Sequence, residues 1–300
     1  MVRNVFLLHR SALLKLLRVF VVLVFIGILL RIDRLALLQA VTKANLLLIT
    51  LALVSAFLSY GFKALRWHVL QHAAGLKPDL RASWRTYMIG IFLSVVTPGK
   101  VGDLGRAAYL KRAGSPLGLA LAITLADRIL DIVTIAALAV MSAGWLWGPT
   151  AGLIAGASLL GILLVGFIAW KHGARIMQLF LRPAPLLFPH LRGESLLLLF
   201  VTTVFGWALY FLWAILLAYA IGITLPVSTL IAVITIAGIV ALIPISPSGF
   251  GTRDAALVTL LAPYDISPES AVALGFLMFS TILISAIPGL FEWMGNPARK

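Results

Sequence analysis

The sequence predicts an all-α integral membrane protein with about six full spans and two oppositely oriented re-entrant hairpins in an inverted repeat. Three observations lead to this prediction. Hydrophobic residues fill 62% of the 300 positions and only 11% are charged, whereas about 25% of residues are charged in soluble domains. Apolar runs of about 20 residues, the length that crosses a bilayer, recur along the chain. Two shorter apolar runs end in proline- and glycine-containing breaks that resemble each other.

Net charge and cysteine content narrow the classes of function. The formal net charge is +14. In a membrane protein this excess indicates basic cytoplasmic loops and contact with anionic lipid, so we expect no nucleic-acid partner. Cysteine is absent, which excludes disulfides, thiol catalysis and cysteine-based metal sites. His68 and His72 share a helix face without a nearby acidic residue, so we expect neither a metal nor a cofactor.

Six apolar segments have the length of a full span. In chain order they are 17–38, 46–62, 117–147, 150–170, 196–221 and 270–291. The basic segment 1–18 has the composition of an interfacial helix, and we expect it to be retained because no small-residue cleavage site follows it. No loop is long enough for a soluble catalytic domain. We therefore expect residues 1–300 to form a single polytopic membrane domain that is not an enzyme.

The charges of the loops predict how the two shorter runs are oriented. Tyr87–Val96 is flanked by the basic stretches 63–85 and 99–116, which places both of its ends in the cytoplasm. Ser228–Ile243 lies between an uncharged loop and a net acidic stretch, which places both of its ends outside. Each run should therefore enter the membrane and return on its own side. The same rule predicts that both termini are cytoplasmic.

The two breaks share an order of residues. The first reads TPGKVGDLGRAAYL from Thr97, and the second reads SPSGFGTRDAALVTL from Ser246. Each is followed by a Ser-Pro pair that opens an alanine-rich membrane helix. We interpret 86–147 and 228–291 as two repeats of opposite orientation, a pattern typical of transporters that bind substrate between broken helices. A chance match of short motifs is the alternative.

The breaks carry residue types that suit an anionic headgroup. Non-helical backbone at membrane depth is tolerated only inside protein or beside water. Glycine lets backbone amides approach a ligand, a helix N-terminus favours anions, and arginine binds phosphate. The candidate residues are Gly99, Gly102, Gly249, Gly251, Arg106 and Arg253. The alternative is that the arginines only extend to the membrane interface.

The stretch LADRILDI places three charges inside the apolar segment 117–147. Asp127 and Asp131 are four positions apart on one helix face, and Arg128 can pair with Asp131 three positions on. A charge at the bilayer centre costs about 2.5–3.5 kcal/mol on insertion scales. We therefore expect these side chains to face the bundle interior or water, where they bind substrate, relay protons or clamp the first break.

At these residues the chain resembles the lysylphosphatidylglycerol synthase/flippase transmembrane-domain family. The family pattern T-P-G-[RK]-x-G-E-x-x-R matches Thr97 to Arg106, with Asp103 in place of glutamate. The pattern S-P-x-G-x-G-x-R-E matches Ser246 to Asp254, again with aspartate at the acidic position. An acid–arginine pair after the first motif matches Asp127-Arg128. The soluble aminoacyl-transferase domain of the synthase members is absent, so lipid aminoacylation is not expected.

The resemblance implies lipid translocation in the bacterial inner membrane, by alternating access, of an anionic or isoprenoid-phosphate lipid held between the two breaks. On this hypothesis the anion contacts Arg106, Arg128 and Arg253. The acidic residues that would orient these arginines or relay protons are Asp103, Asp127, Asp131 and Asp254.

Two other classes of function stay open. One is an accessory protein that binds lipid for a separate glycosyl- or aminoacyl-transferase. The other is an ion-coupled solute transporter, which a closed central cavity without a lateral opening would favour.

Overall fold

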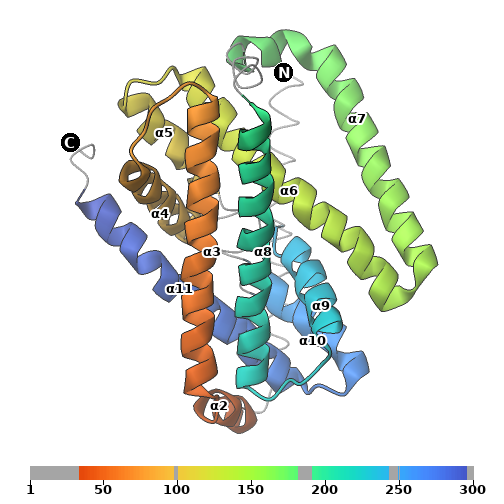
Figure 1. Ribbon diagram of the computed structural model, residues 1–300. Helices are drawn as coiled ribbons and strands as arrows, with labels where there is room; N and C mark the ends of the chain where they lie inside the picture. Colours follow the sequence, from red (N-terminus) through yellow and green to blue (C-terminus); the bar gives the residue numbers. More distant parts are fainter. Residues whose placement is uncertain (1–33, 98–100, 182–190, 243–248, 250, 296–300) are drawn as a thin grey trace, which may run out of the picture.

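The computed structural model describes residues 34–97, 101–181, 191–242, 249 and 251–295, and within them all regular secondary structure is helical (Figure 1). The predicted segment 1–18, most of the predicted span 17–38 and the candidate Gly99 lie outside these residues. The elements are α2 (Arg34–Thr42), α3 (Leu46–Ala73), α4 (Leu80–Val96), η1 (Val101–Leu104), α5 (Gly105–Arg112), α6 (Leu117–Trp147), α7 (Pro149–Leu181), α8 (Gly193–Ala220), α9 (Val227–Val240), α10 (Thr252–Leu261), η3 (Ala262–Tyr264) and α11 (Pro268–Met294).

Five described helices are long and apolar enough to cross a membrane. They are α3, α6, the stretch Pro149–Gly166 of α7, α8 and α11. These helices coincide with five of the six predicted spans. The sixth predicted span lies mostly before the first described residue, and the short helix α2 overlaps its end. The prediction of an all-α membrane protein is thus confirmed.

The predicted boundaries of two helices are wrong. The apolar segment 46–62 does not end before a basic loop, because α3 continues without interruption to Ala73. Its last turns present buried apolar side chains, among them Ala64, Trp67 and Leu70, so packing continues the helix past Lys63 and Arg66. In the same way α7 extends to Leu181, well beyond the predicted end at residue 170.

Helices α3 and α8 lie side by side and run in opposite directions (Figure 1). Small residues allow the close approach. Ser55 Oγ donates to the carbonyl of Leu209 at 2.8 Å, and Ser59 Oγ donates to the carbonyl of Gly206 at 2.7 Å. Small residues and interhelical hydrogen bonds are what hold helices together in a bilayer, where apolar burial gives little drive.

The order of a short helix, a break, a second short helix and a long helix occurs twice. It is seen in α4–α5–α6 and again in α9–α10–α11. In Figure 1 the α4–α5 pair lies toward one end of the molecule, and the α9–α10 pair lies nearer the other. The predicted short runs correspond to α4 and α9, although α4 begins at Leu80, seven residues before the predicted start. Helix α11 packs against both α4 and α10.

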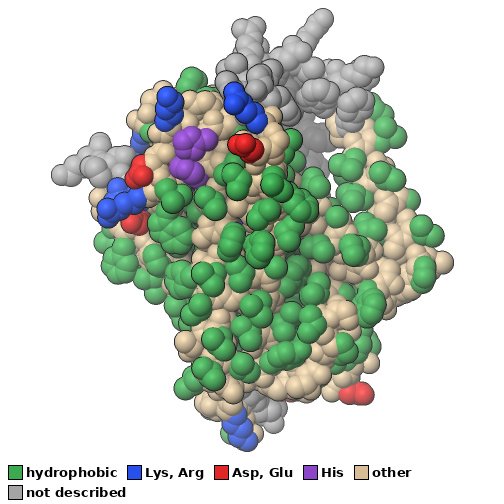
Figure 2. Space-filling view, viewed as in Figure 1, with side chains coloured by type: hydrophobic (Ala, Val, Ile, Leu, Met, Phe, Trp, Pro, Cys, Tyr) green, Lys and Arg blue, Asp and Glu red, His purple; other side chains and the backbone are tan. Residues whose placement is uncertain are grey.

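The outer surface matches a bilayer environment. Figure 2 shows apolar side chains across the middle of one face, with charged side chains near its two ends. Helix α7 exposes a succession of large apolar side chains, including Leu153, Ile154 and Ile162. An apolar surface of this extent would not be stable in water. In a membrane it contacts lipid tails.

Candidate functional site

A cavity of about 510 Å³ lies among α3, α4, η1, α6, α8, α9, α10 and α11. One part of its wall is ionised and the other part is aromatic and aliphatic. The charged lining residues are Lys63, Asp103, Arg128, Asp131 and Arg253. The aromatic lining residues are Tyr60, Tyr87, Trp207, Tyr210 and Trp213. Such a wall suits a ligand with both a charged and an apolar part.

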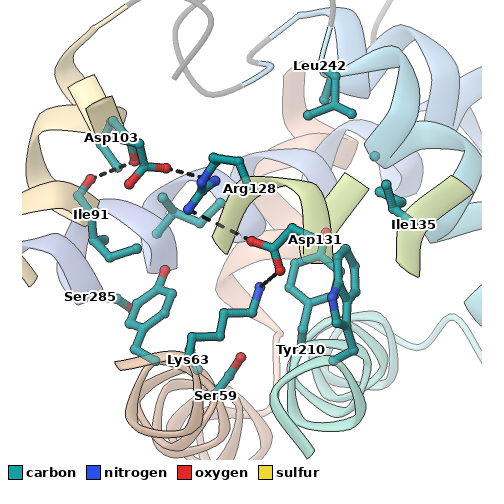
Figure 3. A pocket seen from close by; sticks show the side chains of 18 of the residues that line it. Ser59, Lys63, Ile91, Asp103, Arg128, Asp131, Ile135, Tyr210, Leu242 and Ser285 are labelled. Carbon is teal, nitrogen blue, oxygen red and sulfur yellow. Dashed lines mark hydrogen bonds and ion pairs between the residues drawn. The ribbon is translucent and has the colours of Figure 1, made fainter. Parts of the chain in front are cut away.

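The ionised wall is a chain of ion pairs. Arg128 Nη1 lies 2.8 Å from Asp103 Oδ2, and its Nη2 lies 3.8 Å from Asp131 Oδ2. Lys63 Nζ lies 3.7 Å from Asp131 Oδ1 and 4.7 Å from the ring centre of Trp207. Figure 3 shows Arg128 between the two carboxylates, with Lys63 reaching Asp131 from α3. The pairing of Arg128 with Asp131 that the sequence predicted is confirmed.

Asp127 lies behind this wall and is fully buried. Arg66 Nη2 lies 2.8 Å from its Oδ1 atom, and Arg106 Nη1 lies 2.9 Å from its Oδ2 atom. Since Arg66 is on α3 and Arg106 on α5, this one carboxylate of α6 joins three helices. The sequence left three roles open for the charges of the LADRILDI stretch: substrate binding, proton relay or a clamp on the first break. For Asp127 this geometry fits the clamp.

Arg106 is also enclosed by aromatic rings and is not part of the cavity lining. Its guanidinium carbon lies 4.5 Å from the ring centre of Trp67 and 4.9 Å from that of Tyr87. Gly90 makes room for it, because a Cβ atom there would lie 2.7 Å from the Arg106 side chain. Arg106 therefore links α5 to Asp127 of α6 and packs on aromatic rings of α3 and α4.

The first break is closed by its own hydrogen bonds. The Gly102 N–H donates to Thr97 Oγ1 at 2.7 Å, and Thr97 Oγ1 donates to the Leu93 carbonyl at 2.7 Å. Gly102 also packs directly on the Leu93 carbonyl, which leaves no space for a side chain. The Gly102 amide is therefore used within the protein, and this glycine serves a tight turn.

The second break holds its arginine at the cavity. Gly249 and Gly251 have φ values of +75° and +86°, which glycine adopts without strain. The Gly251 N–H donates to Asp254 Oδ2 at 2.7 Å and so fixes the start of α10. Arg253 Nη2 donates to the Gly275 carbonyl at 2.9 Å. The Nε atom of Arg253 is buried without a hydrogen-bond partner among the described residues, whose nearest carboxylate oxygen, on Asp254, is 3.9 Å away.

The structure thus divides the predicted site residues into two groups. Asp103, Arg128, Asp131 and Arg253 line one cavity although they come from η1, α6 and α10. The predicted residues that are described but are not part of its lining are Gly102, Arg106, Asp127, Gly249, Gly251 and Asp254.

Sequence analysis missed Lys63, Trp207 and Tyr210, which line the cavity. An available signal for Lys63 was the absence of proline and glycine from residue 62 to residue 74, which favours a continuing helix.

No group of three or more histidine and acidic side chains that could hold a metal occurs within the described part of the chain. His68 Nδ1 lies 2.9 Å from Ser83 Oγ, and its ring contacts that of His72.

The spans, the two broken segments and the buried ionic cavity define a multi-pass helical membrane protein with an internal cavity lined by charged residues. The chain belongs to the family described as the lysylphosphatidylglycerol synthase TM region, whose model matches residues 13–289. No curated protein matches the chain. Family membership confirms the resemblance seen in the two break motifs and links this membrane domain to the handling of lipids.

Proposed function

We propose that the protein is a flippase-like transporter that moves an anionic or phosphate-bearing lipid across the bacterial inner membrane. The observation that carries this proposal is the combination of an ionised cavity wall with an apolar exit. Three residues that line the cavity are also well exposed: Leu104 (40%), Ile132 (56%) and Leu242 (44%). They come from η1, from α6 and from the turn after α9, so the cavity has an apolar rim on the outer surface of the bundle.

This rim fits a lipid better than a small solute. A water-soluble substrate needs a path lined by polar groups, whereas acyl or isoprenoid tails are stable against leucine and isoleucine. The headgroup would enter the cavity and the tails would stay in the bilayer. An ion-coupled solute transporter is therefore the weaker hypothesis for this chain.

The headgroup would be held by Arg128, Arg253 and Lys63. Arg128 is the most accessible of these, with 25% of its side chain exposed, and Lys63 follows with 14%. Arg253 is buried and has an unused N–H donor. Charge-assisted hydrogen bonds from guanidinium groups to phosphate are among the strongest in proteins.

Access would alternate through the two broken segments. In this proposal α4–α5 dips in from the cytoplasm and α9–α10 from the opposite face, with both chain termini cytoplasmic. The ion pair between Arg128 on α6 and Asp103 on η1 connects the first segment to the cavity wall. A phosphate that binds Arg128 would compete with Asp103, which gives the lipid a direct means of loosening that segment.

The test uses the purified full chain in proteoliposomes that contain fluorescent phosphatidylglycerol. Transport is measured as the fraction of lipid that becomes accessible to a membrane-impermeant quencher. We expect the chain to accelerate transfer, and Arg253→Gln to abolish the acceleration. Arg85→Gln is the matched control, because Arg85 is exposed and pairs with Glu292 away from the cavity.

Absence of protein-dependent transfer for every anionic or isoprenoid-phosphate lipid tested, with folded protein, would overturn the transport proposal. Native mass spectrometry of the same preparation distinguishes a transporter from the alternative class, a lipid-binding accessory protein. A lipid bound without transport, together with copurification of a glycosyl- or aminoacyl-transferase, would favour the accessory protein.

A further inference from the structure

The charges around the cavity do not cancel. Within the described residues, four cations and three carboxylates form a connected cluster, and Arg253 and Asp254 form a separate pair beside the cavity. Together the cations are Lys63, Arg66, Arg106, Arg128 and Arg253, and the carboxylates are Asp103, Asp127, Asp131 and Asp254. The cavity lining by itself has three of these cations and two of these carboxylates. Both counts leave one positive charge in excess.

Of the three cations that line the cavity, Arg253 lies furthest from a carboxylate. Arg66 and Arg106 each lie within 3 Å of an Asp127 oxygen, and Arg128 lies 2.8 Å from Asp103. Lys63 is held by Asp131 and by the Trp207 ring. Arg253 has only the distant Asp254, whose Oδ2 already accepts from the Gly251 N–H. Within the part of the chain that the structure describes, its buried Nε donor has no hydrogen-bond partner.

A buried charge without a counter-charge is costly, and a ligand that supplies the counter-charge removes that cost. We infer that the ligand of this cavity carries one net negative charge, as does a lipid phosphodiester with an uncharged substituent. This inference rests on the proposed function only in taking the ligand to be a lipid. It assigns the phosphate to Arg253, and the partly exposed Arg128 lines the same cavity.

Other classes of lipid headgroup leave the cavity unbalanced. A phosphomonoester, such as an isoprenoid phosphate, carries about −1.5 to −2 charges at neutral pH and would add negative charge in excess. A zwitterionic headgroup would leave the excess positive charge in place. An aminoacylated lipid such as lysylphosphatidylglycerol carries ammonium groups that offset its phosphate. The charge count therefore disfavours, for this chain, the lipid after which the family is described.

The inference is tested by competition for the purified full chain in detergent micelles. Fluorescent phosphatidylglycerol is the probe. The competitors, with the same acyl chains, are phosphatidylglycerol, phosphatidic acid, phosphatidylcholine and lysylphosphatidylglycerol. We expect phosphatidylglycerol to compete about tenfold or more better than each of the others, because one unmatched charge in a partly buried site is worth at least that factor.

Substitutions that remove a cation or a carboxylate should change, in opposite directions, the ligand charge that the cavity prefers. Arg253→Gln removes the excess, so phosphatidylcholine should compete as well as phosphatidylglycerol. Asp103→Asn and Asp131→Asn each raise the excess to two, so both should come to prefer phosphatidic acid. Arg85→Gln changes the charge of the chain outside the cavity and should leave the ranking unaltered.

The order in which the four lipids compete for the wild-type chain tests the charge match even if a variant does not fold. Equal competition by all four lipids, or a preference for phosphatidic acid or lysylphosphatidylglycerol, would overturn the charge match while leaving lipid transport to its own assay. Conversely, the expected ranking without any transport in proteoliposomes would support the inference and overturn the transport proposal.

Discussion

Arg66 of α3 and Asp127 of α6 form a fully buried ion pair across 61 positions of the sequence, with Arg66 Nε donating to Asp127 Oδ1 at 2.8 Å. Arg106 of α5 binds the other carboxylate oxygen. Helices α3, α5 and α6 are thereby joined at a single carboxylate behind the cavity wall. The position of Arg128, one residue further along α6, depends on this arrangement.

Removal of the Asp127 charge should destabilise the protein strongly. Asp127→Asn leaves Arg66 and Arg106 buried with less counter-charge, and breaking a buried ion pair in this way costs about 3–5 kcal/mol. The free energy of unfolding, measured by denaturant titration in mixed micelles, should fall by this amount.

Glu292→Gln provides the control for that loss. It breaks the exposed pair with Arg85, and exposed ion pairs contribute at most about 1 kcal/mol. Similar losses for the two variants would show that Asp127 does not act as the structural clamp.

Gly275→Ala should displace the second break. A Cβ atom at residue 275 would collide with Asp254 Oδ1, and the Gly275 carbonyl is the acceptor for Arg253. We expect a loss of about tenfold or more in phosphatidylglycerol binding, since Arg253 and the start of α10 must both move to relieve the contact.

Gly61→Ala is the matched helical substitution. Nothing lies within 4 Å of a Cβ atom at residue 61, so this change should leave binding intact and raise stability by up to about 1 kcal/mol. If Gly275→Ala binds the lipid as well as Gly61→Ala does, the proposed place of Arg253 in the site is wrong.

Because the sequence contains no cysteine, a single introduced cysteine is the one thiol that a reagent can label. Ile135 lines the cavity, whereas Val133 on the same helix is 58% exposed and is not part of the lining. In native membranes we expect Ile135→Cys to react with a charged thiol reagent, because a cavity with ionised walls holds water. Val133→Cys should be protected by lipid tails.

Transfer of the protein to micelles of small, rapidly exchanging detergent should narrow the difference between these two labelling rates. Faster labelling of Val133→Cys than of Ile135→Cys in intact membranes would contradict the placement of this part of α6 in the bilayer.

The opposite orientation that we propose for the two broken segments predicts that residues near them are accessible from opposite sides of the membrane. Lys111 is exposed at the end of α5, and Glu269 is partly exposed at the start of α11. In whole cells, a membrane-impermeant thiol reagent that crosses the outer membrane should label Glu269→Cys directly. It should label Lys111→Cys only after the inner membrane is permeabilised. Labelling of both positions from one side would exclude an inverted pair of hairpins.

The local features of the fold could be read from the sequence, because they depend on short-range chemistry. Apolar length identified five of the spans, and prolines and glycines located the ends of α4 and α9 within a few residues. The spacing of Arg128 and Asp131 predicted their pairing, since residues three apart share a helix face. Lys63 and Arg66 were misplaced because charged residues after an apolar run have the same composition as a cytoplasmic loop.

The sequence by itself determined the class of this protein: a helical membrane domain with two interrupted segments and charged residues inside its spans. The tertiary structure decided which of these charges face the cavity. Asp127 pairs with Arg66 and Arg106 behind the wall, whereas Arg253 lines the cavity with a buried Nε donor that has no partner among the described residues. The physical reason is that the balance of a buried charge depends on partners from other helices, such as Arg66 for Asp127. No pattern within one helix records those partners.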